Sequence, residues 1–135
     1  MTADRIGSLL ARAHGVVRHR MTNALEGSGL HLGHIAILSL LADGEGRTQK
    51  ILSAETGIEK SSMVLFLDAL EKEGWVERRP HPGDRRAYLV TLTAKGAKGL
   101  GEVGPRLGNA QVEAFGALSA EEQSQLAAML RKLVG

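Results

Sequence analysis

The sequence lacks cysteine altogether, and aromatic residues make up only 3% of its 135 residues. Without thiols the chain has no disulfide bond, thiolate catalysis, cysteine-ligated zinc or thiol redox sensor, and this composition is typical of a reducing compartment. A core has to be built from leucine, isoleucine, valine and alanine. No apolar run reaches the roughly 18 residues that a membrane span needs, and basic residues interrupt the N-terminal apolar positions. We therefore expect a cytoplasmic protein without membrane association.

Length and charge set further limits. The chain fits one domain of about 100–200 residues, which leaves no room for a separate catalytic domain. The formal net charge of +2 is too small to indicate nucleic-acid binding by itself. Its distribution is more informative, because residues 72–86 hold five basic and three acidic side chains whereas residues 48–71 are net acidic. Charge alone leaves a DNA contact and a solvated hairpin equally open.

Apolar spacing predicts two short helices in the middle of the chain. The first covers residues 48–55 and can be N-capped by Thr48. The second covers residues 60–73 and ends at Gly74. A tight turn containing Gly57 joins them, and two short helices joined in this way are typical of a helix-turn-helix.

A hairpin is predicted directly after these helices. Residues 75–79 and 87–93 are rich in β-branched and aromatic types and predict two strands. The intervening segment 80–86 contains two prolines and a glycine, which predicts a long, irregular and basic tip. A helix-turn-helix followed at once by such a hairpin is a winged helix.

Helices are also predicted on both sides of this module. A periodic apolar stripe predicts a long helix over residues 6–25, and a second helix follows over residues 31–41. After the hairpin comes a glycine-rich helical segment up to about residue 118, which Pro105 is expected to kink. Ser119 and Glu122 have the spacing of a capping box and start the last helix.

Three segments carry a resemblance to a known family. Asp84-Arg85-Arg86 followed by Leu92-Thr93 matches the wing pattern of the MarR family. Residues 70–79 resemble that family's exit from the recognition helix, and the capping box at Ser119 lies where such proteins carry one. Together these segments make the match specific, and it extends nearly from end to end.

The resemblance implies a mainly α fold with a small β-hairpin wing (α+β), a winged helix-turn-helix in a single domain over residues 1–135. Residues 48–93 would form the helix-turn-helix and the wing, and residues 1–28 and 94–135 the dimerisation helices. It further implies a homodimer that binds a pseudo-palindromic operator in double-stranded DNA, and repression that a small anionic or aromatic effector relieves. An enzyme is not expected, nor is a cofactor.

The resemblance and the residue chemistry together predict the DNA contacts. Arg86 is expected to enter the minor groove, where negative potential is concentrated, with its direction set by Asp84. Arg78, Arg79 and Arg85 are placed for phosphates. The other predicted contacts lie on the two helices: Thr48, Gln49, Lys60, Ser61, Ser62 and Leu65.

The recognition helix leaves an alternative open. Its predicted buried face consists of Met63, Phe66, Leu67 and Leu70. Val64 and Leu65 then face outward, and leucine cannot hydrogen-bond a base edge although it can contact a thymine methyl group. Asp68 repels phosphate unless it pairs with Lys72. Such a face would also suit a protein partner, and the wing arginines could instead form ion pairs with hairpin carboxylates.

The histidines supply the candidate ligand residues. His34 and His14 are candidates for an anionic effector between the dimer helices and the DNA-binding lobe, as the resemblance implies, although a buried structural role is as good a reading of His34. His31 and His34 share a helix face, but without an acidic or thiol companion no metal site is predicted. A small-molecule-binding protein or minor enzyme is the second alternative, although the sequence has no recognisable catalytic set.

Overall fold

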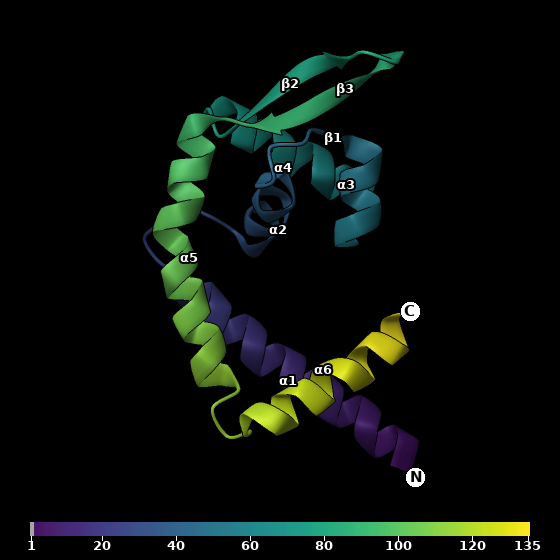
Figure 1. Ribbon diagram of the computed structural model, residues 1–135, viewed down its shortest axis with the longest axis vertical. Coiled ribbons are helices and arrows are strands. Elements are labelled where there is room, and N and C mark those ends of the chain that lie inside the picture. The colour runs from purple at the N-terminus through teal and green to yellow at the C-terminus, as the bar shows by residue number, and fades with distance from the viewer. Residues whose placement is uncertain (1) are drawn as a thin grey trace. The chain divides into compact units, whose positions relative to one another are not determined.

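The computed structural model describes residues 2–135, with side chains from residue 5 onward. These residues form six helices and one three-stranded antiparallel sheet (Figure 1). In chain order the elements are α1 (Thr2–Ala24), α2 (Leu32–Leu41), β1 (Arg47–Thr48), α3 (Gln49–Thr56), α4 (Lys60–Lys72), β2 (Val76–His81), β3 (Asp84–Leu92), α5 (Ala94–Ala114) and α6 (Ala120–Val134). The predicted fold class, mainly helical with a winged helix-turn-helix, is confirmed.

The chain divides into two compact units. The first, which we call the winged unit, is Leu25–Pro105. The second, which we call the helical unit, consists of the residues up to Ala24 together with Arg106–Gly135. Helix α5 contributes to both units, and the last residue of the winged unit is Pro105.

Local chemistry defines the two helices of the helix-turn-helix. The Thr48 hydroxyl accepts a hydrogen bond from the Ile51 N–H at 3.2 Å, so the predicted cap of α3 is confirmed. Gly57 ends α3 with φ at 74°, and Gly74 ends α4 with φ at 76°. Both angles lie in the left-handed region that glycine adopts without steric cost.

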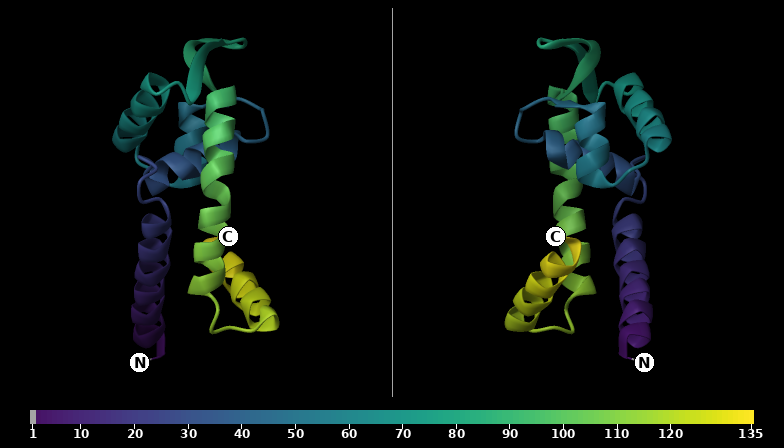
Figure 2. Two further views of the ribbon diagram at one scale, coloured as in Figure 1. Left: turned by 90° about the vertical axis from the view of Figure 1, so that its left-hand side faces the viewer. Right: turned by 90° about the vertical axis from the view of Figure 1, so that its right-hand side faces the viewer.

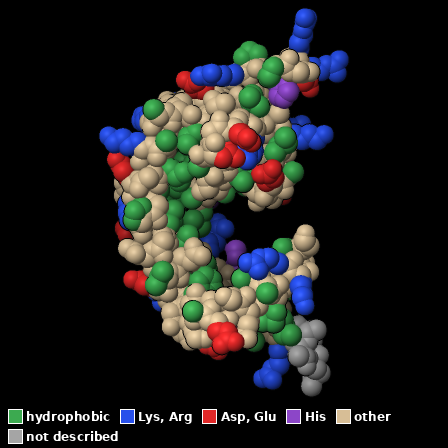
Figure 3. Space-filling view, in the orientation of Figure 1, with side chains coloured by type: hydrophobic (Ala, Val, Ile, Leu, Met, Phe, Trp, Pro, Cys, Tyr) green, Lys and Arg blue, Asp and Glu red, His purple; other side chains and the backbone are tan. Residues whose placement is uncertain are grey.

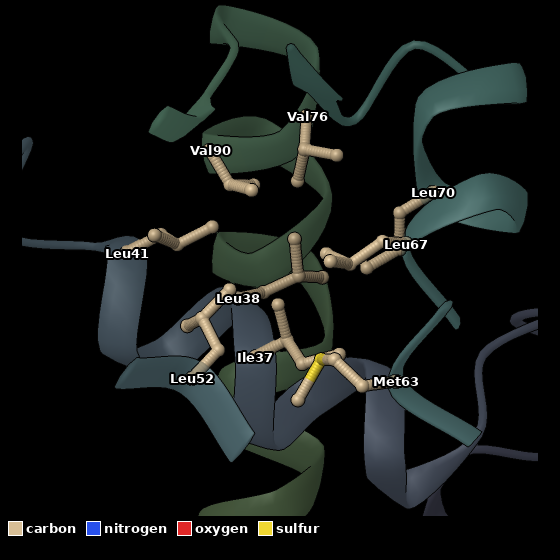
Figure 4. Close-up of a cluster of buried hydrophobic side chains, with 9 residues drawn as sticks. All are labelled: Ile37, Leu38, Leu41, Leu52, Met63, Leu67, Leu70, Val76 and Val90. Atoms are coloured by element: carbon tan, nitrogen blue, oxygen red, sulfur yellow. The ribbon is translucent and has the colours of Figure 1, made fainter. Parts of the chain in front are cut away.

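The winged unit encloses an apolar core, shown in Figure 4. Its nine side chains have at most 2% of their surface exposed: Ile37, Leu38, Leu41, Leu52, Met63, Leu67, Leu70, Val76 and Val90. They come from α2, α3, α4, β2 and β3, so the helix-turn-helix and the wing share one cluster. The predicted inward face of α4 is confirmed, with Phe66 partly buried against the cluster.

The wing differs from the prediction. The two strands extend to His81 and from Asp84, so only residues 82 and 83 of the segment expected to be irregular lie outside a strand. Pro80 fits because β2 is an edge strand, where a missing N–H removes no ladder bond, and a register shift after Pro80 leads into the turn. The hairpin projects beyond the helices of its unit (Figures 1 and 2). A third strand, β1, was not predicted, because two residues carry no periodic signal.

Trp75 explains two of the glycines in α5. A Cβ at Gly99 would overlap the Trp75 ring, and one at Gly96 would overlap the Trp75 carbonyl oxygen. These glycines therefore allow α5 to approach Trp75 closely, rather than only loosening the helix as expected. In contrast, nothing lies within 4 Å of a Cβ built at Gly101. The helix continues through Pro105 and ends at Ala114, earlier than predicted.

The helical unit buries little of its own apolar surface. Its predicted capping box is confirmed, since the Ser119 hydroxyl accepts from the Glu122 N–H at 3.1 Å and the Glu122 carboxylate accepts from the Ser119 N–H at 2.9 Å. Arg20 pairs with Glu113 across the unit at 3.6 Å. Large apolar side chains of α1 and α6 are nevertheless exposed: Ile6, Leu9, Leu10, Val16, Met129 and Leu133. Within the described residues, no helix has the length and apolarity that a membrane crossing requires.

Candidate nucleic-acid interface

A groove of about 920 Å³ lies between the N-terminal part of α3 and strand β3. We call it the wing groove. Its lining residues are Thr48, Gln49, Lys50, Ile51, Ser53, Ala54, Lys60, Arg78, Asp84, Arg86, Ala87, Tyr88 and Val90. It therefore joins the helix-turn-helix to the wing within one surface.

The structure brings together six residues of the predicted DNA interface: five that were predicted to contact DNA, and Asp84, which was predicted to orient Arg86. The wing groove is lined by all of these: Thr48, Gln49, Lys60, Arg78, Asp84 and Arg86. Ser61, Ser62 and Leu65 lie on α4, and Leu65 is 70% exposed. Arg79 and Arg85 lie on the hairpin but do not line the groove.

The end of the wing presents two exposed arginines. The Asp84 carboxylate accepts a hydrogen bond from the Arg86 backbone N–H at 2.9 Å, which holds the chain where the Arg86 side chain leaves it. Across the described residues, no carboxylate lies within ion-pair distance of Arg85 or Arg86. Figure 3 shows basic side chains extending from this end of the hairpin. Both guanidinium groups are therefore available to an anionic partner.

The arginines at the base of the hairpin are different. Arg78 donates to Asp68 at 2.9 Å and to Glu71 at 3.3 Å, and its side chain is only 22% exposed. Asp68 thus has Arg78 as its partner, where the sequence suggested Lys72. Arg79 pairs with Glu77 at 2.9 Å. Two of the hairpin arginines therefore form ion pairs, the alternative that the sequence left open. A phosphate would have to compete with these carboxylates.

A second groove, of about 460 Å³, lies beside α2 and α4 and is lined by His34. We call it the His34 groove. Its lining residues are Ser28, Gly29, Leu30, His34, Ala69, Leu70, Lys72, Glu73 and Trp75. His14 does not line it, because His14 is exposed on α1 in the helical unit. The structure therefore places the two candidate ligand histidines in different units.

His34 and His31 also cap α2. The Nδ1 of His34 accepts from the His31 N–H, and the Nδ1 of His31 accepts from the Gly33 N–H, both at 3.0 Å. Both rings pack on Phe66 of α4, with centroids 5.0 and 5.3 Å from it. Burial, and secondarily the neighbouring His31, lowers the pKa of His34. In the described part of the chain, no group of three or more His, Cys, Asp or Glu side chains could hold a metal ion.

Comparison with known proteins places this geometry in a family. A sequence profile of the MarR family matches residues 28–87, which include both helices of the helix-turn-helix and the wing arginines. The transcriptional repressor MprA of Escherichia coli (strain K12) is 40% identical over 83 residues, which are 62% of this chain and 47% of MprA. Over these residues the chain is similar to the MarR family. It spans about half the length of the curated relatives that it matches.

Solved structures extend this likeness to both units. A transcriptional regulator (MarR family) from Rhodococcus sp. RHA1 is 28% identical, with a TM-score of 0.89 over 98% of this chain and 94% of the other. The transcriptional repressor CouR bound to a 23-mer DNA duplex is 26% identical, with a TM-score of 0.90 over 99% and 95%. These matches cover the helices that the family profile leaves out.

Seven residues that line the wing groove were not predicted as contacts, and Lys50 and Tyr88 are two of them. Tyr88 could have been found, because Arg86, Tyr88 and Val90 alternate along β3 and alternate residues of a strand share a face. The expected irregular tip hid this alternation, since it placed Arg86 outside the strand. Lys50 directly follows the predicted contacts Thr48 and Gln49, in the first turn of α3.

Arg47 is a further residue that the sequence did not single out. It donates to Asp43 at 2.7 and 3.0 Å and lies 3.8 Å from Glu55 on α3. Its hydrogen bonds hold the pKa of Asp43 at about 2. The backbone of Arg47 also pairs with Val90 of β3, so this residue connects the turn after α2 and helix α3, through its side chain, to the wing sheet, through its backbone.

Proposed function

We propose that this chain is a sequence-specific DNA-binding transcriptional regulator, a repressor that a small-molecule ligand releases. The observation that carries this proposal is the pair of exposed arginines, Arg85 and Arg86, at the end of a wing beside the start of α3. The family relatives support it, because MprA is named a transcriptional repressor and CouR is bound to a DNA duplex in its structure.

The contacts follow from the geometry of the winged unit. Arg86, held at its backbone by Asp84, enters the minor groove, where a narrow groove attracts guanidinium groups. Arg85 contacts phosphate as a long charged donor, and Arg78 and Arg79 would do so only by exchanging their carboxylate partners. Helix α4 lies in the major groove. The side chains that complete the interface are Thr48, Gln49, Lys60, Ser61, Ser62 and Leu65.

The helical unit would hold two copies together. Leu9 and Leu10 on α1 are 59% and 45% exposed, and Leu133 on α6 is 70% exposed. Apolar surface of this extent on two helices favours burial against a second copy. A homodimer of this kind presents two recognition helices to a pseudo-palindromic operator, about 34–36 Å apart from centre to centre.

The His34 groove is the proposed effector site. It offers the imidazole of His34, the ammonium of Lys72 and the ring of Trp75, which suit a small anionic or aromatic molecule. Relatives with solved structures bind such molecules: CouR binds p-coumaroyl-CoA, and BpsR of Bordetella bronchiseptica is regulated by 6-hydroxynicotinic acid. The proposal places the protein in the cytoplasm and assigns it no catalysed reaction.

An anisotropy titration with duplexes selected from a random library tests the DNA function. Wild-type protein should bind a selected duplex with steep salt dependence, because phosphate contacts release counterions. Arg86→Ala should weaken binding by about 1–3 kcal/mol, the loss of a charged contact. Lys98→Ala removes an exposed basic residue of α5 outside the wing groove and serves as the control. Equal affinity of Arg86→Ala and wild type would contradict the wing's role, and selection that enriches no sequence would contradict the function.

A further inference from the structure

The exposed face of α4 has an apolar centre. Leu65 lies near the middle of the 13-residue helix and is 70% exposed, while its neighbour Val64 is 37% exposed. Ser61 and Asp68 lie one turn before and one turn after Leu65 on the same face. The side chain at the centre of the outward face of the recognition helix is therefore one that cannot form a hydrogen bond.

The polar neighbours of Leu65 do not replace it as readers of a base edge. Asp68 directs Oδ1 to Arg78 at 2.9 Å, which holds the carboxylate toward the hairpin. Ser61 has a short hydroxyl in the first turn of α4 and suits a phosphate as well as a base. A contact from the centre of this helix to the floor of the major groove is therefore an apolar contact.

The major groove offers one apolar group for such a contact, the C5-methyl group of thymine. We infer that Leu65, flanked by Val64, reads a thymine methyl group in each operator half-site. This inference rests on the proposed DNA-binding function. It names the feature of the operator that the recognition helix selects, with Leu65 as the specificity-determining residue.

The charges around this face favour DNA over a protein as its occupant. Lys60 lies on the same helix, and Lys50 and Arg86 line the adjacent wing groove. The nearest acidic side chains on α4, Asp68 and Glu71, are both paired with Arg78. An apolar centre bordered by cations matches a methyl group that lies between two rows of phosphates.

Uracil substitution isolates the methyl group, because deoxyuridine keeps every hydrogen-bonding group of thymine and lacks only the methyl. A duplex selected from a random library is resynthesised with each thymine replaced singly by uracil, and binding is measured by anisotropy at one salt concentration. Wild-type protein should lose about fourfold in affinity at one thymine of a half-site, as expected for one buried methyl group. Substitution in both half-sites should multiply the two losses.

The same titrations with Leu65→Ala assign the contact to its residue. This variant should bind thymine and uracil duplexes equally well, and its fold should be intact because the side chain is exposed. Ser61→Ala removes a polar group from the same face and should keep the full sensitivity to uracil.

Three results would overturn the inference, and each is distinguishable. If wild-type protein binds its selected duplex but no uracil weakens it, methyl reading is wrong while the DNA function stands. If Leu65→Ala keeps the sensitivity, another residue makes the contact. If selection enriches no sequence and Leu65 instead proves necessary for binding a protein, the proposed function fails and the inference fails with it.

Discussion

The two units of this chain differ in how far they bury their apolar side chains. In the winged unit nine apolar side chains from five elements are almost completely removed from water. In the helical unit, among the described side chains, only Leu107 and Ala110 are buried, and no side chain of α6 is. The winged unit therefore has a filled apolar core of its own, whereas the helical unit leaves most of its large apolar side chains exposed.

This difference in burial fits the two roles that we propose for the two units. A DNA-binding surface needs side chains held in fixed positions, and a filled core on which α3, α4 and the wing all pack provides this. The proposed dimer surface instead needs exposed apolar area, and α1 and α6 have such area. The following predictions test whether the two units can be disturbed independently.

The largest expected effect is on self-association. Leu9→Glu introduces a charge on the exposed apolar face of α1, and in the proposed homodimer this charge would be buried in both copies. The dimer dissociation constant, measured by sedimentation, should rise by roughly 100-fold or more, since each 1.4 kcal/mol is about tenfold. Leu65→Glu changes an exposed leucine of the winged unit and should leave the dissociation constant unchanged. An unchanged dissociation constant in Leu9→Glu would show that this face of α1 makes no dimer contact.

A smaller effect is expected from two glycines of α5 that are two residues apart. Gly99→Ala forces a methyl group into the Trp75 ring and should lower the free energy of unfolding by about 1–3 kcal/mol. Gly101→Ala meets open space and should raise it by up to about 1 kcal/mol, because alanine favours a helix more than glycine does. Urea denaturation of the two variants measures both changes. Stabilisation by Gly99→Ala would mean that α5 does not pack closely on Trp75.

The smallest expected effect is the pH dependence that His34 contributes. Its pKa is lowered in the folded chain, so the unfolded state binds the proton more readily, and stability falls as the pH drops below about 6.5 toward the folded pKa. Protonation also removes the Nδ1 lone pair that accepts from the His31 N–H. His34→Gln keeps an acceptor at the third position of the capping box but does not titrate. The melting temperature should change less between pH 8 and pH 5 in this variant than in the wild type. An equal change in both would assign the pH dependence to other groups.

The helices of the winged unit could be predicted because their signals are local. The Thr48 cap, the apolar spacing of Met63, Leu67 and Leu70, and the glycines that end α3 and α4 all act within a few residues of where they lie. Features that depend on distant partners were missed or altered. Strand β1 exists only because Arg47 and Thr48 pair with β3, and Gly99 has its role only because Trp75 packs against it.

In the candidate site, too, local features could be predicted and features that depend on distant partners could not. Asp84 and Arg86 belong to one local pattern, and the structure gives Asp84 a hydrogen bond that positions Arg86. Arg78 was expected to be a phosphate contact, but its carboxylate partners lie on α4, and no spacing in the sequence reveals that β2 runs beside that helix. Tyr88 was missed for a related reason, since strand pairing in the wing depends on long-range contacts that overrode the expected irregular tip.

Pro105 has a mechanical consequence. Because proline has no amide hydrogen, the carbonyl oxygen of Gly101 has no partner four residues further along α5, so the hydrogen-bond ladder of that helix has a gap. Bending at this point breaks no additional backbone bond, and Gly101, Gly104 and Gly108 add little stiffness around it. The elastic stiffness of α5 is therefore lowest where one compact unit ends and the other begins.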